Sequence, residues 1–440
     1  MPEAERGGGA GPRVLEAERG QMRWQTVDLE AAVPPAHRAR VIWATVEQLD
    51  LTAFYDAIAA RGSVAGRPAI DPKILLTLWL YAISEGIGSA RHVARLCTRD
   101  DVYRWICGGV EPNHHTVSDF RVGHGAKLDA LLTEVLAALM SAGVLRLRRV
   151  AQDGVRVRAH AGAASFRRGR KLAGYLAEAE AQVAALQAEL TEATGASTAR
   201  ERAARARAVR ERETRLRRAL AELPKVQQVR ERNAKREGTA RRAQRGEAEV
   251  RVSTTDPEAR VMRMGDGGYR PAVNVQFASD TETRLIVGVG VSNAGTDRGQ
   301  LTPMLDQIVA RTGGAAPAEY LVDGGYAHLA AIDAVEARGV TVYAPVTTPR
   351  RADIDPYARK PDDTDRTAGW RARMATDDAK RIYPERAATA ETVHADQRAW
   401  RGLHQLPVRG LPKAWCIALW AALLHNILRA DVLLRSALGS

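Results

Sequence analysis

The chain has 440 residues, of which 45% are hydrophobic, and a formal net charge of +13 at pH 7. This length exceeds one ordinary core and predicts two or three domains, while the positive charge favours a polyanionic partner. The three cysteines, Cys97, Cys107 and Cys416, lack CxxC spacing. That absence argues against a zinc site or a disulfide framework and is typical of proteins in a reducing cytosol.

The apolar segments do not predict a membrane anchor. Residues 1–30 are polar and glycine-rich, which indicates a disordered tail and not a signal peptide. No stretch reaches the ~18 apolar residues of a membrane-spanning helix. The most apolar segment, AWCIALWAALLHNILRADVLL, is interrupted by His425, Asn426, Arg429 and Asp431. We therefore expect a buried C-terminal helix, with His425 and Asn426 satisfying hydrogen bonds inside it.

Residues 31–145 have a helical pattern. One helix is predicted to start with Asp71 as N-cap and Pro72 at the first helical position, and a glycine turn ends it. A second helix follows at once, capped by Ser89. Two helices across a glycine turn resemble a DNA-binding helix-turn-helix, a pattern that many other helical pairs share.

The next segment, PNHHTVSDFRVGHGAKLDALLTEVLAALMSAG, predicts one long amphipathic helix that starts near Thr116 or Ser118. His114 and His115 precede this start. A loop or DNA contact explains the pair better than a metal site does.

Residues 149–159 predict the first strand of a sheet, in which apolar side chains alternate with Arg156, Arg158 and His160. Asp153 has the parity of the apolar residues. A carboxylate on an apolar face is costly to desolvate unless a cation neutralises it. Asp153 is therefore a candidate for chemistry.

An inserted helical hairpin is expected after this strand. Apolar residues repeat at heptad spacing from Leu172 through Leu186 to Leu190, and TGAS at 194–197 breaks the pattern. A second helix carries Val209, Leu216, Leu220 and Leu223. The two segments predict an antiparallel pair of helices.

This insertion carries most of the excess positive charge. Between Thr198 and Arg245 there are 17 Lys and Arg residues against 6 Asp and Glu residues. A solvated helix face and a basic arm along nucleic acid explain this charge equally well, since clustered cations are rewarded by counterion release from phosphates.

From residue 250 the hydrophobic period returns to two. RPAVNVQFASD and RLIVGVGVS predict an antiparallel hairpin, and DRGQLTPMLDQIVARTG predicts a helix. The strand EYLVDGGY, the helix HLAAIDAVEARG and the strand VTVYAPV follow, so a parallel, layered α/β sheet is expected from residue 318. TTPRRADIDPYARKPDDTD is predicted to be a polar loop, and residues 384–435 are predicted to be helical.

Two further acids have positions suited to chemistry. Asp323 ends the apolar run YLVD before two glycines, at the carboxyl end of a parallel strand, where ligands bind; its alternative role is to cap a helix or support a turn. Glu391 lies two helical turns before Arg398, a spacing that alone indicates a surface pair. Together with Asp153, these acids come from three separate elements. Converging carboxylates can hold two divalent cations for phosphoryl transfer, and Mg²⁺ suits carboxylate and phosphate oxygens.

With these three acids, the sequence resembles the bacterial insertion-sequence transposases of the DDE superfamily. The likeness covers roughly residues 35–430. It rests on QDGVRVRAHAGAASFRR, STTDPEARVMRMGDGGYRPAVNVQFASD, VSNAGTDRGQLTPML, YLVDGGY and the segment that begins YPERAATAETVHADQRAWRGL. The family signature in the last segment places a Tyr, an Arg, the catalytic Glu and a Lys. The matching residues are Tyr383, Arg386, Glu391 and Arg398.

Two of these matches depart from the family pattern. Arg398 replaces the lysine and keeps its charge. Arg386 lies five residues before Glu391, one more than the commonest spacing, which turns its side chain away from the Glu391 face. Glu385 is a weaker rival for the catalytic glutamate, because it follows Pro384 at a helix start where an acid is expected as a cap.

The resemblance implies an α/β ribonuclease-H-like core, built from a mixed sheet flanked by helices, with an N-terminal all-α domain and an inserted helical hairpin or coiled coil. The implied parts are a tail at 1–30, a helical DNA-binding domain at 31–145, the first core strand at 146–166, the basic insertion at 167–248 and the rest of the core at 249–435.

The resemblance also implies a DNA transposase. Asp153, Asp323 and Glu391 would hold two Mg²⁺ ions, for which Mn²⁺ can substitute, and would support strand cleavage and then strand transfer. Expected DNA contacts come from Arg398, Arg386, Tyr383, Arg91, Arg95 and Arg121. The implied partners are double-stranded DNA, as element ends and target, and a second copy of the chain on that DNA. The implied location is the bacterial cytoplasm, near the nucleoid and away from membranes.

The sequence is also compatible with two other functions. One is a ribonuclease-H-like nuclease without strand transfer, and the other is a catalytically inactive, transposase-derived DNA-binding protein. Asp256 and Asp266 precede the second strand and either form turns, the preferred interpretation, or line the site.

Overall fold

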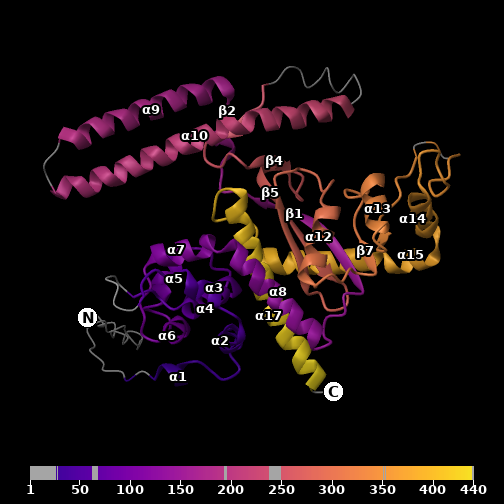
Figure 1. The fold of residues 1–440 in the computed structure, drawn as a ribbon, viewed down its shortest axis with the longest axis horizontal. Coiled ribbons are helices and arrows are strands. Elements are labelled where there is room, and N and C mark those ends of the chain that lie inside the picture. Colours follow the sequence, from indigo (N-terminus) through magenta and orange to yellow (C-terminus); the bar gives the residue numbers. More distant parts are fainter. Residues whose placement is uncertain are drawn as a thin grey trace, which may run out of the picture.

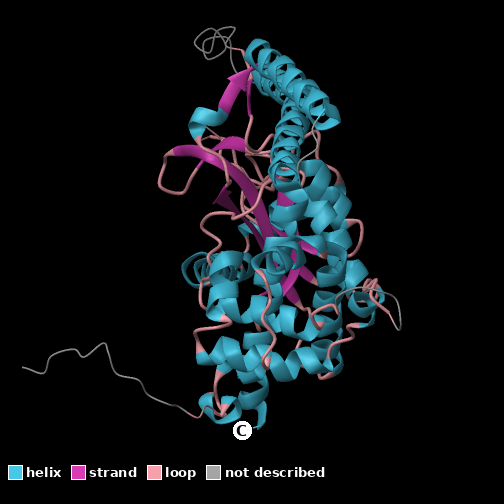
Figure 2. Cartoon of the chain, turned by 90° about the vertical axis from the view of Figure 1, so that its left-hand side faces the viewer, coloured by secondary structure: helices cyan, strands magenta, loops and turns pink. Residues whose placement is uncertain are grey.

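The computed structural model describes residues 26, 28–61, 68–192, 196–236, 249–349, 351 and 353–438. A group of N-terminal helices, a mixed sheet covered by helices and a long helical hairpin make up the molecule (Figures 1 and 2). The tail expected at residues 1–30 lies almost wholly outside the described residues.

The N-terminal helices gather on one side of the last helix, α17 (Figure 1). They are α1 (Leu29–Ala32), α2 (Arg38–Gln48), α3 (Thr52–Asp56), α4 (Pro72–Ser84), α5 (Ala90–Leu96), α6 (Asp101–Cys107), α7 (His114–Gly123) and α8 (Gly125–Ser141). Asp71 caps α4 by accepting a hydrogen bond from the Lys73 N–H at 2.8 Å. Ser89 caps α5. Both predicted helix starts are therefore confirmed, and α5 packs mainly on α7.

The single long helix predicted after residue 116 is wrong. The chain forms two helices, because Asn113 caps α7 at His114 and the helical run is interrupted at His124 before α8 begins. A Cβ atom on Gly125 would lie 3.0 Å from Cys416 Sγ. A glycine at this break lets the last helix pack closely, a tertiary requirement that local periodicity does not reveal.

The sheet is built around β1 (Arg149–Arg158). Its strand order is β4 (Arg260–Arg263), β5 (Tyr269–Asp280), β1, β7 (Glu319–Leu321) and β8 (Thr341–Tyr343), and β6 (Ile286–Ser292) also pairs with β5. β5 runs antiparallel to β1, β4 and β6, whereas β7 is parallel to both β1 and β8. The predicted antiparallel hairpin and the parallel strands beyond residue 318 are confirmed.

Helices flank this sheet and continue to the C-terminal region. They are α12 (Leu301–Arg311), α13 (Leu329–Glu336), α14 (Asp365–Ala375), α15 (Asp377–Ile382), α16 (Pro384–Ala395) and a π-helical turn at Asp396–Trp400. Helical structure therefore returns earlier than the predicted residue 384. The reason is that Thr364 accepts a hydrogen bond from the Thr367 N–H and caps α14, at the end of the expected polar loop.

The last helix, α17 (Leu411–Leu438), joins the N-terminal helices to the sheet. By length and composition alone, Leu411–Ser436 is the one helix among the described residues that could cross a membrane. It instead packs against α8 and β6, and Trp420 and Leu423 are fully buried. This burial agrees with the predicted buried C-terminal helix.

His425 and Asn426 of α17 bind neighbouring elements and do not form their side-chain hydrogen bonds inside the helix. The Asn426 side chain accepts a hydrogen bond from the Ile286 N–H at 2.8 Å and donates one to the Ile286 carbonyl at 2.8 Å. His425 lies 2.9 Å from the Arg284 carbonyl and 3.0 Å from Asp396. Asn426 thereby completes the backbone hydrogen bonds at the start of β6.

The predicted helical hairpin is confirmed as α9 (Gly169–Glu192) and α10 (Ala196–Arg236), which pack along each other (Figure 1). Its base is tied to the core by two short paired strands, β2 (Phe166–Arg168) and β3 (Arg251–Ser253). Leu172, Leu216 and Val252 are buried together there. The side chains of Leu186 and Leu190, and the first two residues of the TGAS break, lie outside the described residues.

We predict that Asn426→Ala destabilises the fold by about 2 to 4 kcal/mol, because it leaves the buried N–H and carbonyl of Ile286 without partners. The change should appear as a lower midpoint of urea unfolding. Val432→Ala on the exposed side of the same helix is the control, and an equal midpoint for the two variants would contradict the role of Asn426.

Candidate active site

Strand register brings two of the predicted acids together. β1 and β7 are parallel neighbours, with Arg149 opposite Glu319 and Ala151 opposite Leu321. The same register, extended by two residues, sets Asp153 beside Asp323. Neighbouring strands lie about 4.8 Å apart, and paired residues of parallel strands point to the same face. The two carboxylates are thus neighbours despite their separation in sequence.

The electrostatics agree with this proximity. Burial raises the pKa of Asp153 above its ordinary value, and the charge of Arg386 partly offsets that effect. Burial also raises the pKa of Asp323, and the neighbouring charge of Asp153 raises it further. Two half-buried carboxylates that repel each other form a site where a cation would be favourable.

Arg386 lies inside this site. Its Nη1 donates to Asp153 Oδ2 at 3.1 Å, and both side chains are largely buried. The guanidinium lies over the ring of Tyr383, 6.0 Å from the ring centroid. Burial raises the pKa of Tyr383, which the guanidinium of Arg386 lowers and the charge of Asp323 raises. Tyr383 and Arg386, two of the six predicted DNA contacts, are therefore next to the carboxylate pair. The five-residue spacing turns Arg386 away from Glu391, and its side chain instead contacts Asp153.

A third acid, Asp297, was not predicted from the sequence. Its Oδ1 accepts hydrogen bonds from Asn274 Nδ2 and Gln276 Nε2, both at 2.7 Å, and its Oδ2 pairs with Arg156 Nη2 at 3.1 Å. The charge of Asp297 raises the pKa of Asp153 and of Asp323. The available signal was the pair of amides at alternate positions of an otherwise apolar strand, RPAVNVQFASD.

Two glycines make room for Asp297. A Cβ atom on Gly154 would lie 2.2 Å from Asp297 Oδ1, which no side chain tolerates. A Cβ atom on Gly325 would lie 2.9 Å from Asp323 Oδ1 and 3.4 Å from Asp297 Oδ2. Asp297 and Asp323 therefore lie against the same glycine, and the glycines that follow Asp153 and Asp323 in sequence serve close packing.

Glu391 is placed differently from the two aspartates. It is exposed on α16, about 140° around the helix from Arg386, and lines a hollow of about 570 Å³ with Gly154, His394 and Arg398. Burial lowers the pKa of His394 to about 4, so this imidazole is neutral at pH 7. Among the described residues, no three His, Cys, Asp or Glu side chains are arranged to hold a metal ion.

The remaining predicted DNA contacts lie in three places. Arg398 is exposed in the hollow beside Glu391. Arg91 and Arg95 line a separate hollow of about 530 Å³ between α5 and the start of α7. Arg121 is buried, where it donates to the Gly88 carbonyl and lies 4.7 Å from the Trp79 ring centroid. This placement gives Arg121 a structural role and does not favour the predicted DNA contact.

The other acids considered from the sequence have structural partners. Glu385 pairs with Arg149 at 2.5 Å, at the start of β1. Asp256 is buried and accepts a hydrogen bond from the Gly410 N–H at 3.2 Å. Asp266 is an exposed turn residue bound to Arg270 and to the Gly268 N–H. The turn interpretation of Asp266 agrees with this geometry, and Asp256 supports the start of α17.

The donor set at β1 and β7 fits a divalent cation. Carboxylate oxygens are the preferred ligands of Mg²⁺. Burial raises the pKa of both Asp153 and Asp323, and the charge of Arg386 only partly offsets that effect, so a bound cation would stabilise the ionised pair. Asp153 and Asp323 are thus suited to hold such an ion, with Glu391 at the adjoining hollow.

Two family models match the chain. The model described as Transposase domain (DUF772) matches residues 27–123, and the model described as Transposase DDE domain matches residues 249–427. Together they span more than half of the chain. No curated protein and no solved structure matches it.

The second match contains Asp297, Asp323 and Glu391, whereas Asp153 and the inserted hairpin lie outside both ranges. The assignment of Asp153 to the site accordingly rests on strand register and electrostatics. The two matches also imply binding to DNA and cleavage of nucleic acid. The chain belongs to the DDE transposases of insertion sequences.

Proposed function

We propose that this transposase binds the ends of its element and cleaves and joins DNA strands at Asp153, Asp323 and Glu391. The observation that supports the proposal is the parallel pairing of β1 with β7 up to Ala151 and Leu321. Extended by two residues, that register sets Asp153 beside Asp323, next to the hollow that Glu391 lines. The sheet order supports a ribonuclease-H-like core, since the first strand is central, antiparallel strands lie on one side and two parallel strands lie on the other.

Divalent cations are the proposed cofactor, with two Mg²⁺ ions held by Asp153, Asp323 and Glu391 and with Mn²⁺ as a substitute. When bound, Mg²⁺ supplies Lewis-acid stabilisation of the charge that develops during phosphoryl transfer. Arg386 holds Asp153 Oδ2 in place. Movement of Glu391 toward the aspartate pair, as DNA fills the hollow, would complete the acid set.

The chain's own cations would orient the phosphodiester. Arg156 and Arg398 line the hollow beside Glu391 and are suited to phosphate contacts that carry no sequence information. Water would attack the phosphorus and release a 3′-hydroxyl. That hydroxyl would then attack a phosphodiester of the target, so one P–O bond forms and one breaks in each step. The buried, neutral imidazole of His394 forms part of the wall of the hollow beside Glu391 and would exclude water from that side.

Two element ends must be joined in transposition, so the proposed assembly is a homodimer on double-stranded DNA. The bacterial cytoplasm, near the nucleoid, is the proposed location because the substrate is genomic DNA. Arg91 and Arg95, which line the hollow between α5 and α7, are the proposed contacts of the N-terminal helices with element ends.

We predict that Asp153→Asn and Asp323→Asn each lower strand cleavage at least 100-fold in Mg²⁺ while DNA binding is retained, because each removes a carboxylate from the proposed cation site. Glu391→Gln should do the same. The measurement is cleavage and joining of a labelled, pre-cut duplex end. Asp266→Asn, in an exposed turn, is the matched control, and undiminished cleavage by Asp153→Asn would refute the assignment. Cleavage without joining by the wild type would identify a nuclease.

A second prediction concerns the cation without any turnover. Mg²⁺ should stabilise the folded wild type by mass action, by about 1.4 kcal/mol at a tenfold excess over the dissociation constant. The measured quantity is the resulting rise in the thermal midpoint. Asp153→Asn should lose this shift. Arg386→Gln should reach half of it at a lower Mg²⁺ concentration, because a competing positive charge is gone. The same Mg²⁺ response in all three proteins would place cation binding elsewhere.

A third prediction tests whether cleavage depends on the position of Asp297, which pairs with Arg156 at the hollow. Gly154→Ala would displace Asp297 from its amide partners and is expected to cost about 1 to 3 kcal/mol in stability and at least tenfold in cleavage rate. Gly162→Ala, where a Cβ atom would meet nothing within 4 Å, should behave as wild type. Full cleavage by Gly154→Ala would exclude Asp297 from the machinery.

A further inference from the structure

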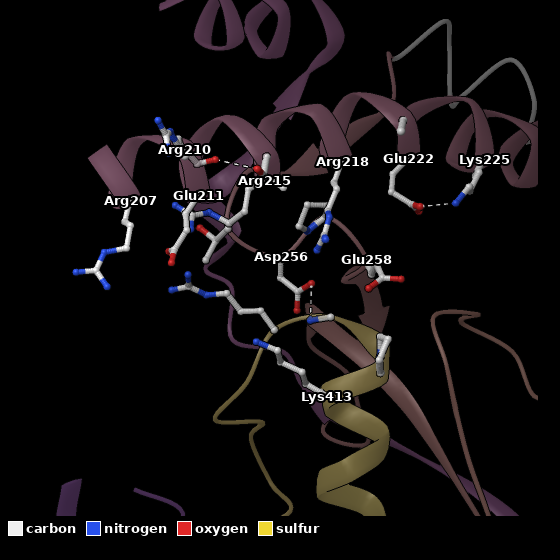
Figure 3. Close-up of a pocket in the computed structure, with 17 residues that line it drawn as sticks. Arg207, Arg210, Glu211, Arg215, Arg218, Glu222, Lys225, Asp256, Glu258 and Lys413 are labelled. Carbon is white, nitrogen blue, oxygen red and sulfur yellow. Dashed lines mark hydrogen bonds and ion pairs between the residues drawn. The ribbon is translucent and has the colours of Figure 1, made fainter. Parts of the chain in front are cut away.

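A groove separates the inserted hairpin from the start of the last helix. It has a volume of about 950 Å³ and lies between one face of α10 and the residues around Gly410 (Figure 3). Seven Arg or Lys side chains and four Asp or Glu side chains line it. Figure 3 shows Arg207 and Arg218 extending from the side of α10 on which the start of α17 and Lys413 lie.

The acids of the groove are occupied by the protein itself. Asp256 accepts a hydrogen bond from the Gly410 N–H at 3.2 Å, and Glu258 accepts one from the Leu411 N–H at 2.9 Å, so both cap the start of α17. Glu222 pairs with Lys225 and Arg260, and Glu211 pairs with Arg215 within α10. These carboxylates fix the walls of the groove and leave little negative charge for its other cations.

Several cations of the groove consequently lack a counter-charge. Within the described ranges, no carboxylate lies within the 4.0 Å ion-pair distance of Arg207, Arg218, Arg409 or Lys413. All four side chains are exposed. Partial burial lowers the pKa of the neighbouring Arg215, and the charge of Arg409 lowers it further. Crowded like charges of this kind are stabilised by a polyanion and repel other cations.

The groove is long, and its α10 wall is anchored to the core sheet. The lining face of α10 runs from Arg207 to Lys225, which is about 27 Å at the rise of an α-helix. A DNA duplex presents a phosphate on each strand every 3.4 Å or so, so this face spans about eight base pairs. The pair between Glu222 and Arg260 of β4 anchors α10 to the core sheet.

One loop links the groove to the candidate active site. His404 lines the hollow with Glu391, and Arg409, five residues later, lines the groove. The loop is held against β1, because the Leu406 N–H donates to the Arg158 carbonyl at 2.8 Å. Five residues span at most about 18 Å, a length of roughly five base pairs at the spacing of duplex phosphates.

We propose that this groove holds the phosphate backbone of the DNA duplex whose cleavage site lies at Asp153 and Asp323, and that the inserted hairpin is a clamp on that duplex. The inference rests on the proposed function. The DNA contacts of the basic insertion would then lie on the face of α10 that lines the groove, opposite the start of α17. The partner is duplex DNA, since the unneutralised charges follow a length of several base pairs.

The test is the salt dependence of DNA binding, measured by fluorescence anisotropy with a 30-base-pair duplex of random sequence and without Mg²⁺. The groove variant combines Arg207→Gln, Arg218→Gln and Lys413→Gln. The matched control combines Arg170→Gln, Lys171→Gln and Arg205→Gln, three exposed cations of the same hairpin outside the groove. Glutamine retains helix propensity, and circular dichroism of both variants verifies the fold.

The slope of log K against log salt should become shallower by about 2 to 3 in the groove variant, since each lost phosphate contact removes about 0.9. The control should change by less than 1. Equal changes in the two variants, or no change in the groove variant, would overturn the clamp while leaving cleavage at Asp153 intact. A wild type that does not bind the duplex at low salt would overturn DNA binding itself, and with it the proposed function.

Discussion

The repulsion between Asp153 and Asp323 is the constraint around which the core is arranged. The parallel register of β1 and β7, extended by two residues, sets the two carboxylates side by side, and burial raises the pKa of both. Two such groups are expensive to bury without positive charge. Arg386 supplies part of that charge, and the exposed hollow beside Glu391 leaves access for more. Such burial costs folding free energy, a cost that the proposed binding of a cation would offset.

The surrounding residues serve to hold this arrangement. Asn274 and Gln276 fix Asp297 from β5, and Asp297 in turn fixes Arg156 at the edge of the hollow. Gly154 is the residue that permits this approach. On the other side of β5, Asn426 ties the last helix to β6. The site is therefore carried by rigid strands, while Glu391 is carried by a helix that adjoins the hollow.

Much of this could be predicted from the sequence where local signals decide the structure. Asp71 with Pro72 marked a helix start, and the parity of Asp153 among apolar residues marked a strand with an odd carboxylate. The break at Gly125 and the role of Asp297 could not be predicted, because each depends on a residue distant in sequence, Cys416 in one case and Gly154 in the other. The five-residue spacing predicted that Arg386 turns away from Glu391. It could not predict the partner of Arg386, which is Asp153 on another element. Local patterns identified Asp153, Asp323 and Glu391 as candidates, whereas the contacts of Asp297 and Arg386 follow from tertiary packing.

Asp153 and Asp323 are proposed to share a divalent cation. Anomalous diffraction from crystals containing Mn²⁺ tests it most directly, because Mn²⁺ scatters anomalously and substitutes for Mg²⁺. A peak is expected within about 2.5 Å of a carboxylate oxygen of both residues, in the range of oxygen ligands to such ions, and no peak is expected there in Asp153→Asn crystals. A manganese site that involves neither aspartate would contradict it.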